Sequence, residues 1–228
     1  MIFIFNTKKL EINKLKSKID DPSHWLTPQR VHGYLERADR IPHRADAEEV
    51  LLDFIPTSAR RVLDLGTGDG RLIRLLKRKI PTVKFVAIDF SPPMLKILKQ
   101  QFRNDSSVTI IEHDLDSGLP NIGYFDAVIS SLSLHHLKND RKKYLYSGIY
   151  SILGPGGVFC NFDHFASKSR RMNKYFRKLM GRQRAPNKDH EKRLTYVESE
   201  IDWLKRIGFQ DVDCYWKWLQ FAVIISFK

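Results

Sequence analysis

A cluster of glycine and aspartate residues carries the clearest chemical signal in this sequence. The segment Asp64-Leu65-Gly66-Thr67-Gly68-Asp69-Gly70 follows a short apolar run and precedes a helical pattern. Glycines at such a turn let the backbone bend sharply and approach a ligand closely. In an open α/β sheet the turn lies at the carboxyl end of its strand, where ligands bind. We therefore predict a ligand site built from Asp64, Gly66, Thr67, Gly68 and Gly70.

Two further carboxylates, Asp89 and Asp114, end the next two predicted strands. Asp89 can accept hydrogen bonds from ribose hydroxyls, and Asp114 can accept one from an adenine amino group. Phe90 and Met94 can cover an adenine face. A dinucleotide turn places a third glycine where this chain has Arg71, and carboxylates repel a diphosphate. The set therefore favours a positively charged sulfonium nucleoside.

Groups that can move protons follow two later predicted strands. His135 and His136 follow one, and Asp163 and His164 end the next. Imidazole titrates near neutrality, so each is a candidate base or acceptor contact; the alternative is that they only pack or meet solvent. Arg44 is a candidate clamp for the cofactor carboxylate, because guanidinium offers a bidentate fork, or else belongs to a surface turn. No acidic ligand set is evident, so we predict no metal.

Apolar runs and turn residues predict an alternation of strands and helices. The runs are short and almost continuously apolar, which is typical of strands covered on both faces in a parallel sheet. A Thr195-to-Glu198 spacing predicts a capping box at the last helix, and two final β-rich runs predict an antiparallel hairpin. Predicted strands cover 61–65, 83–88, 108–111, 125–130, 158–162, 212–216 and 219–227; predicted helices cover 45–55, 72–79, 91–102, 144–153 and 197–207.

At these motifs the chain resembles the class I S-adenosylmethionine-dependent methyltransferases. The similar segments are 64–70, 86–91, 112–115, 125–137 and 153–157, and the resemblance runs over 45–164 and from 195 to the end. It implies an α/β, doubly wound, Rossmann-like sheet of seven strands in the order 3-2-1-4-5-7-6, with strand 7 antiparallel.

The same resemblance implies roles for particular residues. Gly66 and Gly68 would contact the methionine part of the cofactor and Asp89 the ribose. Asp114 and Leu115 would hold adenine. Ser130 or Ser131 would lie beside the sulfonium, and the product would be S-adenosylhomocysteine.

We expect the methyl acceptor to bind to the parts of the chain that match no motif. We assign 1–44 to an N-terminal arm and cap segment, 45–228 to the methyltransferase domain, and 165–194 to a substrate or lid insert. Within a net charge of +13, residues 168–193 hold eleven Lys and Arg and two acids. Met172, Tyr175, Phe176, Leu179 and Met180 predict a helical apolar face that packs on the domain, closes the pocket, or lies on an anionic membrane.

We expect an enzyme that methylates a small molecule by in-line transfer. The alternatives are an RNA methyltransferase using the basic insert, an NAD(P)-dependent oxidoreductase, and a non-catalytic S-adenosylmethionine-binding module. Neither a leader nor a spanning segment is evident, so we expect a cytoplasmic protein. The methylated atom, the need for a general base and the oligomeric state stay open.

Overall fold

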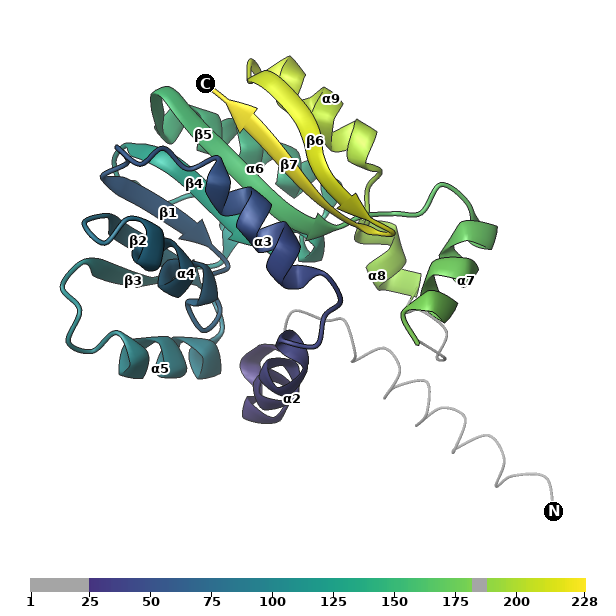
Figure 1. Cartoon of the computed structure of the whole chain (residues 1–228), viewed down its shortest axis with the longest axis horizontal. Helices are drawn as coiled ribbons and strands as arrows, with labels where there is room; N and C mark the ends of the chain where they lie inside the picture. Colours follow the sequence, from purple (N-terminus) through teal and green to yellow (C-terminus); the bar gives the residue numbers. More distant parts are fainter. Residues whose placement is uncertain (1–24, 182–187) are drawn as a thin grey trace.

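The computed structural model describes residues 25–181 and 188–228, and within them the core is one mixed sheet (Figure 1). Its order is β3-β2-β1-β4-β5-β7-β6. Neighbours from β3 to β5 pair in parallel, and β7 runs antiparallel to both β5 and β6. The predicted order and terminal hairpin are thus confirmed. The strands are β1 (Arg61–Leu65), β2 (Lys84–Asp89), β3 (Val108–Glu112), β4 (Phe125–Ser131), β5 (Leu153–His164), β6 (Gln210–Trp218) and β7 (Phe221–Phe227).

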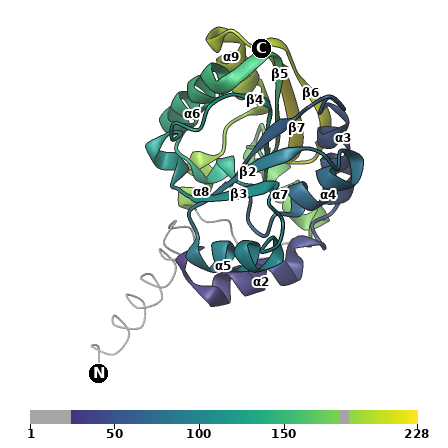
Figure 2. The same cartoon turned by 90° about the vertical axis from the view of Figure 1, so that its left-hand side faces the viewer.

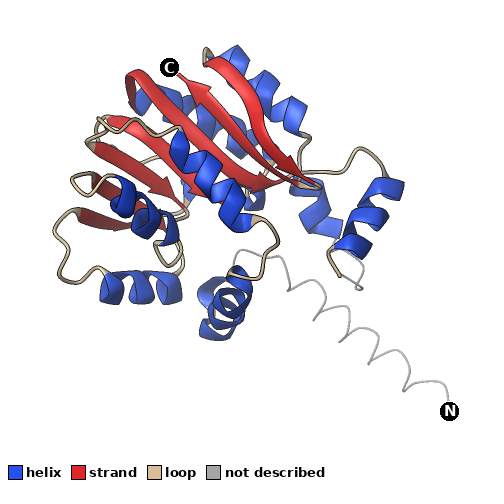
Figure 3. Ribbon diagram, viewed as in Figure 1, coloured by secondary structure: helices blue, strands red, loops and turns tan. Residues whose placement is uncertain are grey.

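Helices cover both faces of the sheet, and others lie beyond the carboxyl ends of its parallel strands (Figure 3). Helices α3, α4 and α5 pack on one face and α6 and α9 on the other, whereas α2, α7 and α8 lie at the carboxyl edge (Figure 2). The helices are α2 (Pro28–Ala38), α3 (Arg44–Asp53), α4 (Arg71–Lys79), α5 (Pro92–Gln101), α6 (Asn139–Ile152), α7 (Arg170–Leu179), α8 (Lys188–Arg193) and α9 (Val197–Ile207).

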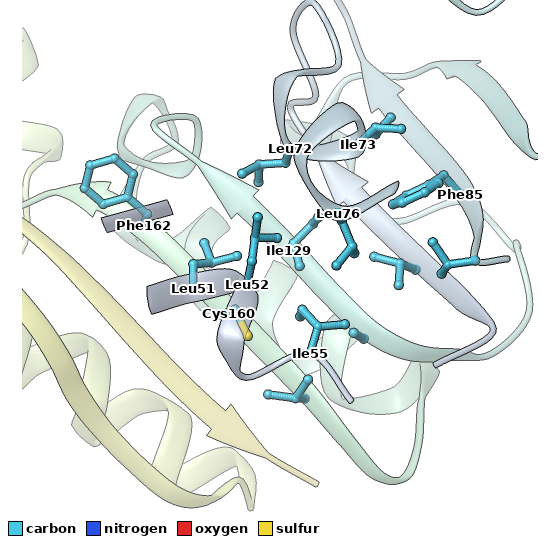
Figure 4. Close-up of a cluster of buried hydrophobic side chains, with 14 of the residues drawn as sticks. Leu51, Leu52, Ile55, Leu72, Ile73, Leu76, Phe85, Ile129, Cys160 and Phe162 are labelled. Carbon is cyan, nitrogen blue, oxygen red and sulfur yellow. The ribbon is translucent and has the colours of Figure 1, made fainter. Parts of the chain in front are cut away.

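Successive residues of a strand belong to two separate apolar clusters, one on each face of the sheet. In β1, Val62 joins the cluster under α3 and α4, whereas Leu63 joins the one under α6 and α9. Side chains alternate across a strand, so an unbroken apolar run supplies both faces. Figure 4 shows the first cluster, in which Leu51 and Leu76 reach the sheet from two helices. This double covering fixes the strand ends that carry the site.

Three local predictions are wrong: the start of one helix, the glycine turn after it, and the capping box at the last helix. Helix α6 begins at Asn139 rather than Tyr144, and β5 follows it directly at Leu153, so the glycines at 154–157 lie in a strand instead of a terminating turn. The capping box is wrong: Tyr196 is the N-cap of α9, and the Thr195 hydroxyl bonds Glu200 instead. The predicted N-terminal arm and cap segment, 1–44, is described from Trp25 onward, and its residues 1–24 lie outside the described residues.

Candidate active site

The glycine turn after β1 has the left-handed backbone conformation that its composition predicts. Gly66 has a φ of +63° and Gly68 a φ of +58°, a region that L side chains rarely adopt. A Cβ on Gly66 would lie 1.8 Å from Ser133 Oγ and 2.5 Å from Ser133 Cβ. The turn therefore touches the loop after β4 so closely that only glycine fits at position 66.

Two carboxylates hold this turn, from opposite sides. Asp64 lies behind it, where its Oδ2 accepts from the Thr67 hydroxyl at 2.7 Å, and burial raises the Asp64 pKa to about 7. Asp89 at the end of β2 accepts the N–H groups of Gly68 at 2.8 Å and Ser91 at 2.9 Å. Burial raises the Asp89 pKa, and those N–H groups partly offset the effect. The loops after β1 and β2 are thereby fixed to each other.

A cavity of about 400 Å³ opens in front of the turn. Nine of the predicted site residues line it, and they come from the carboxyl ends of β1, β2, β3 and β4 and the segments that follow them. They are Gly66, Gly68, Asp89, Phe90, Met94, Asp114, Leu115, Ser131 and His136. Side chains from strands far apart in sequence thus share one cavity at the carboxyl edge of the sheet.

Other predicted residues lie behind the cavity lining. Gly70 packs under α5, because a Cβ there would lie 2.5 Å from Phe102 Cε2. The Ser130 hydroxyl donates to the Leu65 carbonyl at 2.9 Å, which ties β4 to β1. Together with Asp64 and Thr67, these residues shape the loops and do not line the cavity.

Arg44 also lies off the cavity lining, in a buried polar network. Its Nε donates to Glu48 Oε1 at 2.7 Å and its Nη1 to the Tyr34 hydroxyl at 3.3 Å. Glu48 in turn accepts from Arg71 at 2.6 Å and from the Ser131 hydroxyl at 3.2 Å. Arg44 thus supports Tyr34 and Ser131, which line the cavity, from the rear. Composition gave no sign of this fully buried glutamate.

The predicted proton-transfer residues, three imidazoles and one carboxylate, lie together at the ends of β4 and β5. His135 Nδ1 lies 2.5 Å from Asp163 Oδ1, which also accepts the His164 N–H at 2.9 Å. The His135 ring lies 4.0 Å, between centroids, from the His136 ring. Of these four residues His136 lines the cavity. Burial raises the Asp163 pKa to about 6, with Lys142 and His136 acting in the opposite direction.

The wall opposite the glycine turn comes from residues that we did not predict as site residues. Trp25 and Tyr34 meet edge to face at 5.3 Å between ring centroids, and Trp25 lies 5.7 Å from the His136 ring. The Ser91 hydroxyl donates to the Trp25 carbonyl at 2.5 Å. Arg193 adds a cation, and its Nη1 donates to the His136 carbonyl at 3.3 Å. Trp25 and Tyr34 belong to the N-terminal segment and Arg193 to the insert, the parts without motifs.

A buried ion pair anchors the end of that wall. Lys142 Nζ donates to Glu200 Oε1 at 3.0 Å and to the Arg193 carbonyl at 3.2 Å. Glu200 also accepts from the Tyr146 hydroxyl at 2.5 Å, and burial raises the Tyr146 pKa well above its ordinary value. Paired charges of this kind tolerate burial only when their remaining hydrogen bonds are made. The network fixes the backbone that presents Arg193.

Across residues 25–181 and 188–228, no three His, Cys, Asp or Glu side chains form a group that could hold a metal ion. No helix in those same ranges has the length and apolarity needed to cross a bilayer.

The chain also matches known proteins. Residues 62–157 match a family model described as a methyltransferase domain. An uncharacterised methyltransferase of Mycobacterium tuberculosis is 36% identical over 111 residues, which cover 48% of this chain and 54% of that protein. The chain thus spans about half the length of that relative. A carboxy-S-adenosyl-L-methionine synthase of Desulforapulum autotrophicum is 27% identical over 200 residues, 79% of each chain.

Solved structures agree on the fold. The human N-acetylserotonin methyltransferase in complex with S-adenosylmethionine superposes with a TM-score of 0.68 at 17% identity. The match covers 93% of this chain and 59% of the human protein.

Proposed function

Because this chain belongs to the class I S-adenosylmethionine-dependent methyltransferases, we propose that it transfers the cofactor methyl group to a small-molecule acceptor beside His136. The observation that carries the proposal is one cavity that joins two chemically different halves. One half has glycines and carboxylates, and the other has an imidazole, two cations and two aromatic rings. A cavity of about 400 Å³ with aromatic walls is typical of small-molecule sites.

The glycine and carboxylate half fits a sulfonium nucleoside. In our proposal Asp89 binds the ribose hydroxyls, Asp114 and Leu115 hold the adenine edge, and Phe90 and Met94 cover its face. Gly66 and Gly68 contact the methionine part through their backbone. Gly68 leaves room for it, since a Cβ there would meet nothing closer than Met94 Sδ at 4.0 Å. Asp89 and Asp114 favour a cation over a diphosphate in this half.

Thr67, Gly70, Asp64 and Ser130 contribute in this scheme by holding the loops in place. Arg44 keeps a role at the cofactor site through Tyr34 and Ser131, whose positions it supports. Direct contact between Arg44 and the cofactor carboxylate would need its bond to Glu48 to open.

The cofactor supplies a methyl group already activated by a positively charged sulfur. The acceptor atom forms a bond to that carbon as the carbon–sulfur bond breaks, and sulfur keeps the electron pair to give S-adenosylhomocysteine. Collinear placement of acceptor, carbon and sulfur supplies much of the rate. We assign that placement to Ser131 on one side and to Trp25 and Tyr34 on the other.

His136 is the proposed base for an acceptor that must lose a proton. Its ring lines the cavity, and a neutral imidazole nitrogen can take an O–H or N–H proton. His135, Asp163 and His164 are then positioning residues. Asp163 fixes the His135 ring by the 2.5 Å contact, and His135 packs against His136.

The test separates cofactor binding from turnover. S-adenosylhomocysteine should raise the melting temperature of the protein, and NAD should not. His136→Ala should keep that shift and lose turnover of small-molecule acceptors from a screen that also contains total RNA. Absence of any shift would refute the cofactor site, a shift without turnover of any acceptor would favour a binding module, and turnover of RNA alone would favour the nucleic-acid alternative.

A second candidate activity is synthesis of carboxy-S-adenosyl-L-methionine, the reaction named for the Desulforapulum relative. It is supported by the length of that match and by Lys138 and Arg193, two cations on the cavity wall that can bind a carboxylate. Mass spectrometry decides between the two. A nucleoside product that carries an added carboxyl group would replace S-adenosylhomocysteine as the main product.

A further inference from the structure

Helices α4 and α7 are both amphipathic and rich in basic residues, but they differ in how far their apolar side chains are buried. In α4 the apolar residues Leu72, Ile73 and Leu76 are buried against the sheet. In α7 no residue is buried, and Tyr175 and Leu179 are each 54% exposed. An amphipathic helix normally covers its apolar side with protein. Helix α7 therefore has an apolar edge that the described residues, 25–181 and 188–228, leave exposed.

Most basic side chains of α4 are paired with acids, whereas those of α7 are not paired with any acid in the described part of the chain. Four cations of α4 pair with acids: Arg71 with Glu48 and Asp39, Arg74 with Asp69, Lys77 with Asp105 and Lys79 with Asp53. Residues 168–180 hold six Lys and Arg and no acid. Among the described residues, no acid pairs with any of the cations within α7, and Lys168 just before it pairs with Glu198. Helix α7 thus carries an uncompensated positive surface.

The exposed apolar and cationic side chains lie on one arc of α7. Tyr175 and Leu179 are one turn apart, and Arg171, Lys174 and Lys178 follow beside them at helical spacing. All five are exposed. Such an arc places apolar groups in the acyl boundary of a bilayer while the cations meet anionic headgroups.

We propose that α7 docks this protein on an anionic lipid bilayer. RNA explains the cations but not the exposed Leu179, and the arc presents one aromatic ring rather than a stacking platform. A bilayer explains both, because the apolar pair gains from burial and the cations from the surface potential.

Helix α7 connects to the cavity wall through two contacts. Asn173 Nδ2 donates to Glu191 Oε1 at 2.8 Å, which joins α7 to α8. Arg193 at the end of α8 donates to the His136 carbonyl and lines the cavity. If the proposed function holds, on which this consequence rests, docking brings the acceptor half of the cavity to the lipid surface, and the acceptor is amphiphilic.

Vesicle co-sedimentation of the full chain tests the docking without cofactor or acceptor. The protein should co-sediment with phosphatidylglycerol–phosphatidylcholine vesicles. It should stay in the supernatant when the vesicles contain phosphatidylcholine alone. K174Q/K178Q should weaken binding roughly 25-fold, about fivefold per charge removed. K96Q/K99Q is the matched control, because it removes two exposed lysines from α5, and it should change binding less than about threefold.

A second variant separates the apolar contribution from general electrostatics. Y175S/L179S should keep low-salt binding and lose the binding that survives at high salt, because salt screens the cations alone. Equal losses in the α7 and α5 lysine variants would overturn the proposal. So would α7-dependent binding of RNA by a chain that ignores anionic vesicles. A melting-temperature shift with S-adenosylhomocysteine, measured without vesicles, reports on the proposed function separately and shows that each variant is folded.

Discussion

Replacing Gly66 with alanine should destabilise the protein by about 2–5 kcal/mol. Two effects combine. A left-handed backbone costs an L-residue roughly 1–2 kcal/mol, and extra volume in a packed region costs roughly 1–3 kcal/mol. The second effect applies because the new Cβ would lie 2.5 Å from Ser133 Cβ, an atom that side-chain rotation cannot move away.

Gly68→Ala is the matched control for this change. Its φ of +58° is close to the +63° of Gly66, so the backbone cost is the same, and its Cβ meets nothing closer than 4.0 Å. The loss of unfolded-state entropy is also shared and cancels between the two variants. The difference of about 1–3 kcal/mol between them therefore isolates the contact with Ser133.

Urea and thermal unfolding measure both variants. At roughly 2–4 °C per kcal/mol for a chain of this size, Gly66→Ala should lower the melting temperature by about 4–20 °C. Ser133→Gly added to Gly66→Ala should recover the contact cost, with a coupling of about 1–3 kcal/mol in a double-mutant cycle. Equal stability of the two alanine variants, or a coupling near zero, would show that the loops after β1 and β4 do not touch as described.

Three more changes test the site and its supports. Burial raises the Asp64 pKa from 3.8 to about 7, so the folded state retains a proton that the unfolded state releases; stability should fall by about 4 kcal/mol as pH rises from about 4 to 7. Asp64→Asn should flatten that slope in urea melts, and an unchanged slope would contradict the assignment. Lys142→Met should cost about 3–5 kcal/mol because it strands the Glu200 carboxylate, and adding Glu200→Gln should recover much of the loss in the same unfolding assay. Asp89→Asn should weaken S-adenosylhomocysteine binding at least tenfold in calorimetry, and unchanged affinity would remove Asp89 from the cofactor site.

The sheet was predictable because its signals are local. Val62 and Leu63 belong to an unbroken apolar run, and such a run indicates a strand covered on both faces. The glycines at 66 and 68 mark the turn by composition alone. The side chains at the ends of successive parallel strands then had to meet at one edge, and Asp89 and Asp114 line the same cavity.

The opposite wall was not predictable, because long-range packing places it. Trp25 and Tyr34 come from a segment in which we predicted no helix or strand, and contacts with Ser91 and Arg44 fix them. Thr195 has the spacing of a capping residue, but tertiary contact with Glu200 overrides that local preference. Arg193 lies in a charge-rich stretch where composition does not show which cation turns inward.

The wall formed by Trp25 and α2 is held to the rest of the domain by little apolar surface. Val31 and Ala38 are the buried residues of α2. The Ser91 hydroxyl donates to the carbonyl of Trp25, which precedes α2. Segments with so few buried side chains detach at a lower free energy than a core strand. If the proposed function holds, local detachment of this segment would let S-adenosylhomocysteine leave while the sheet stays folded, and the rate of product release would then depend on how weakly α2 is packed.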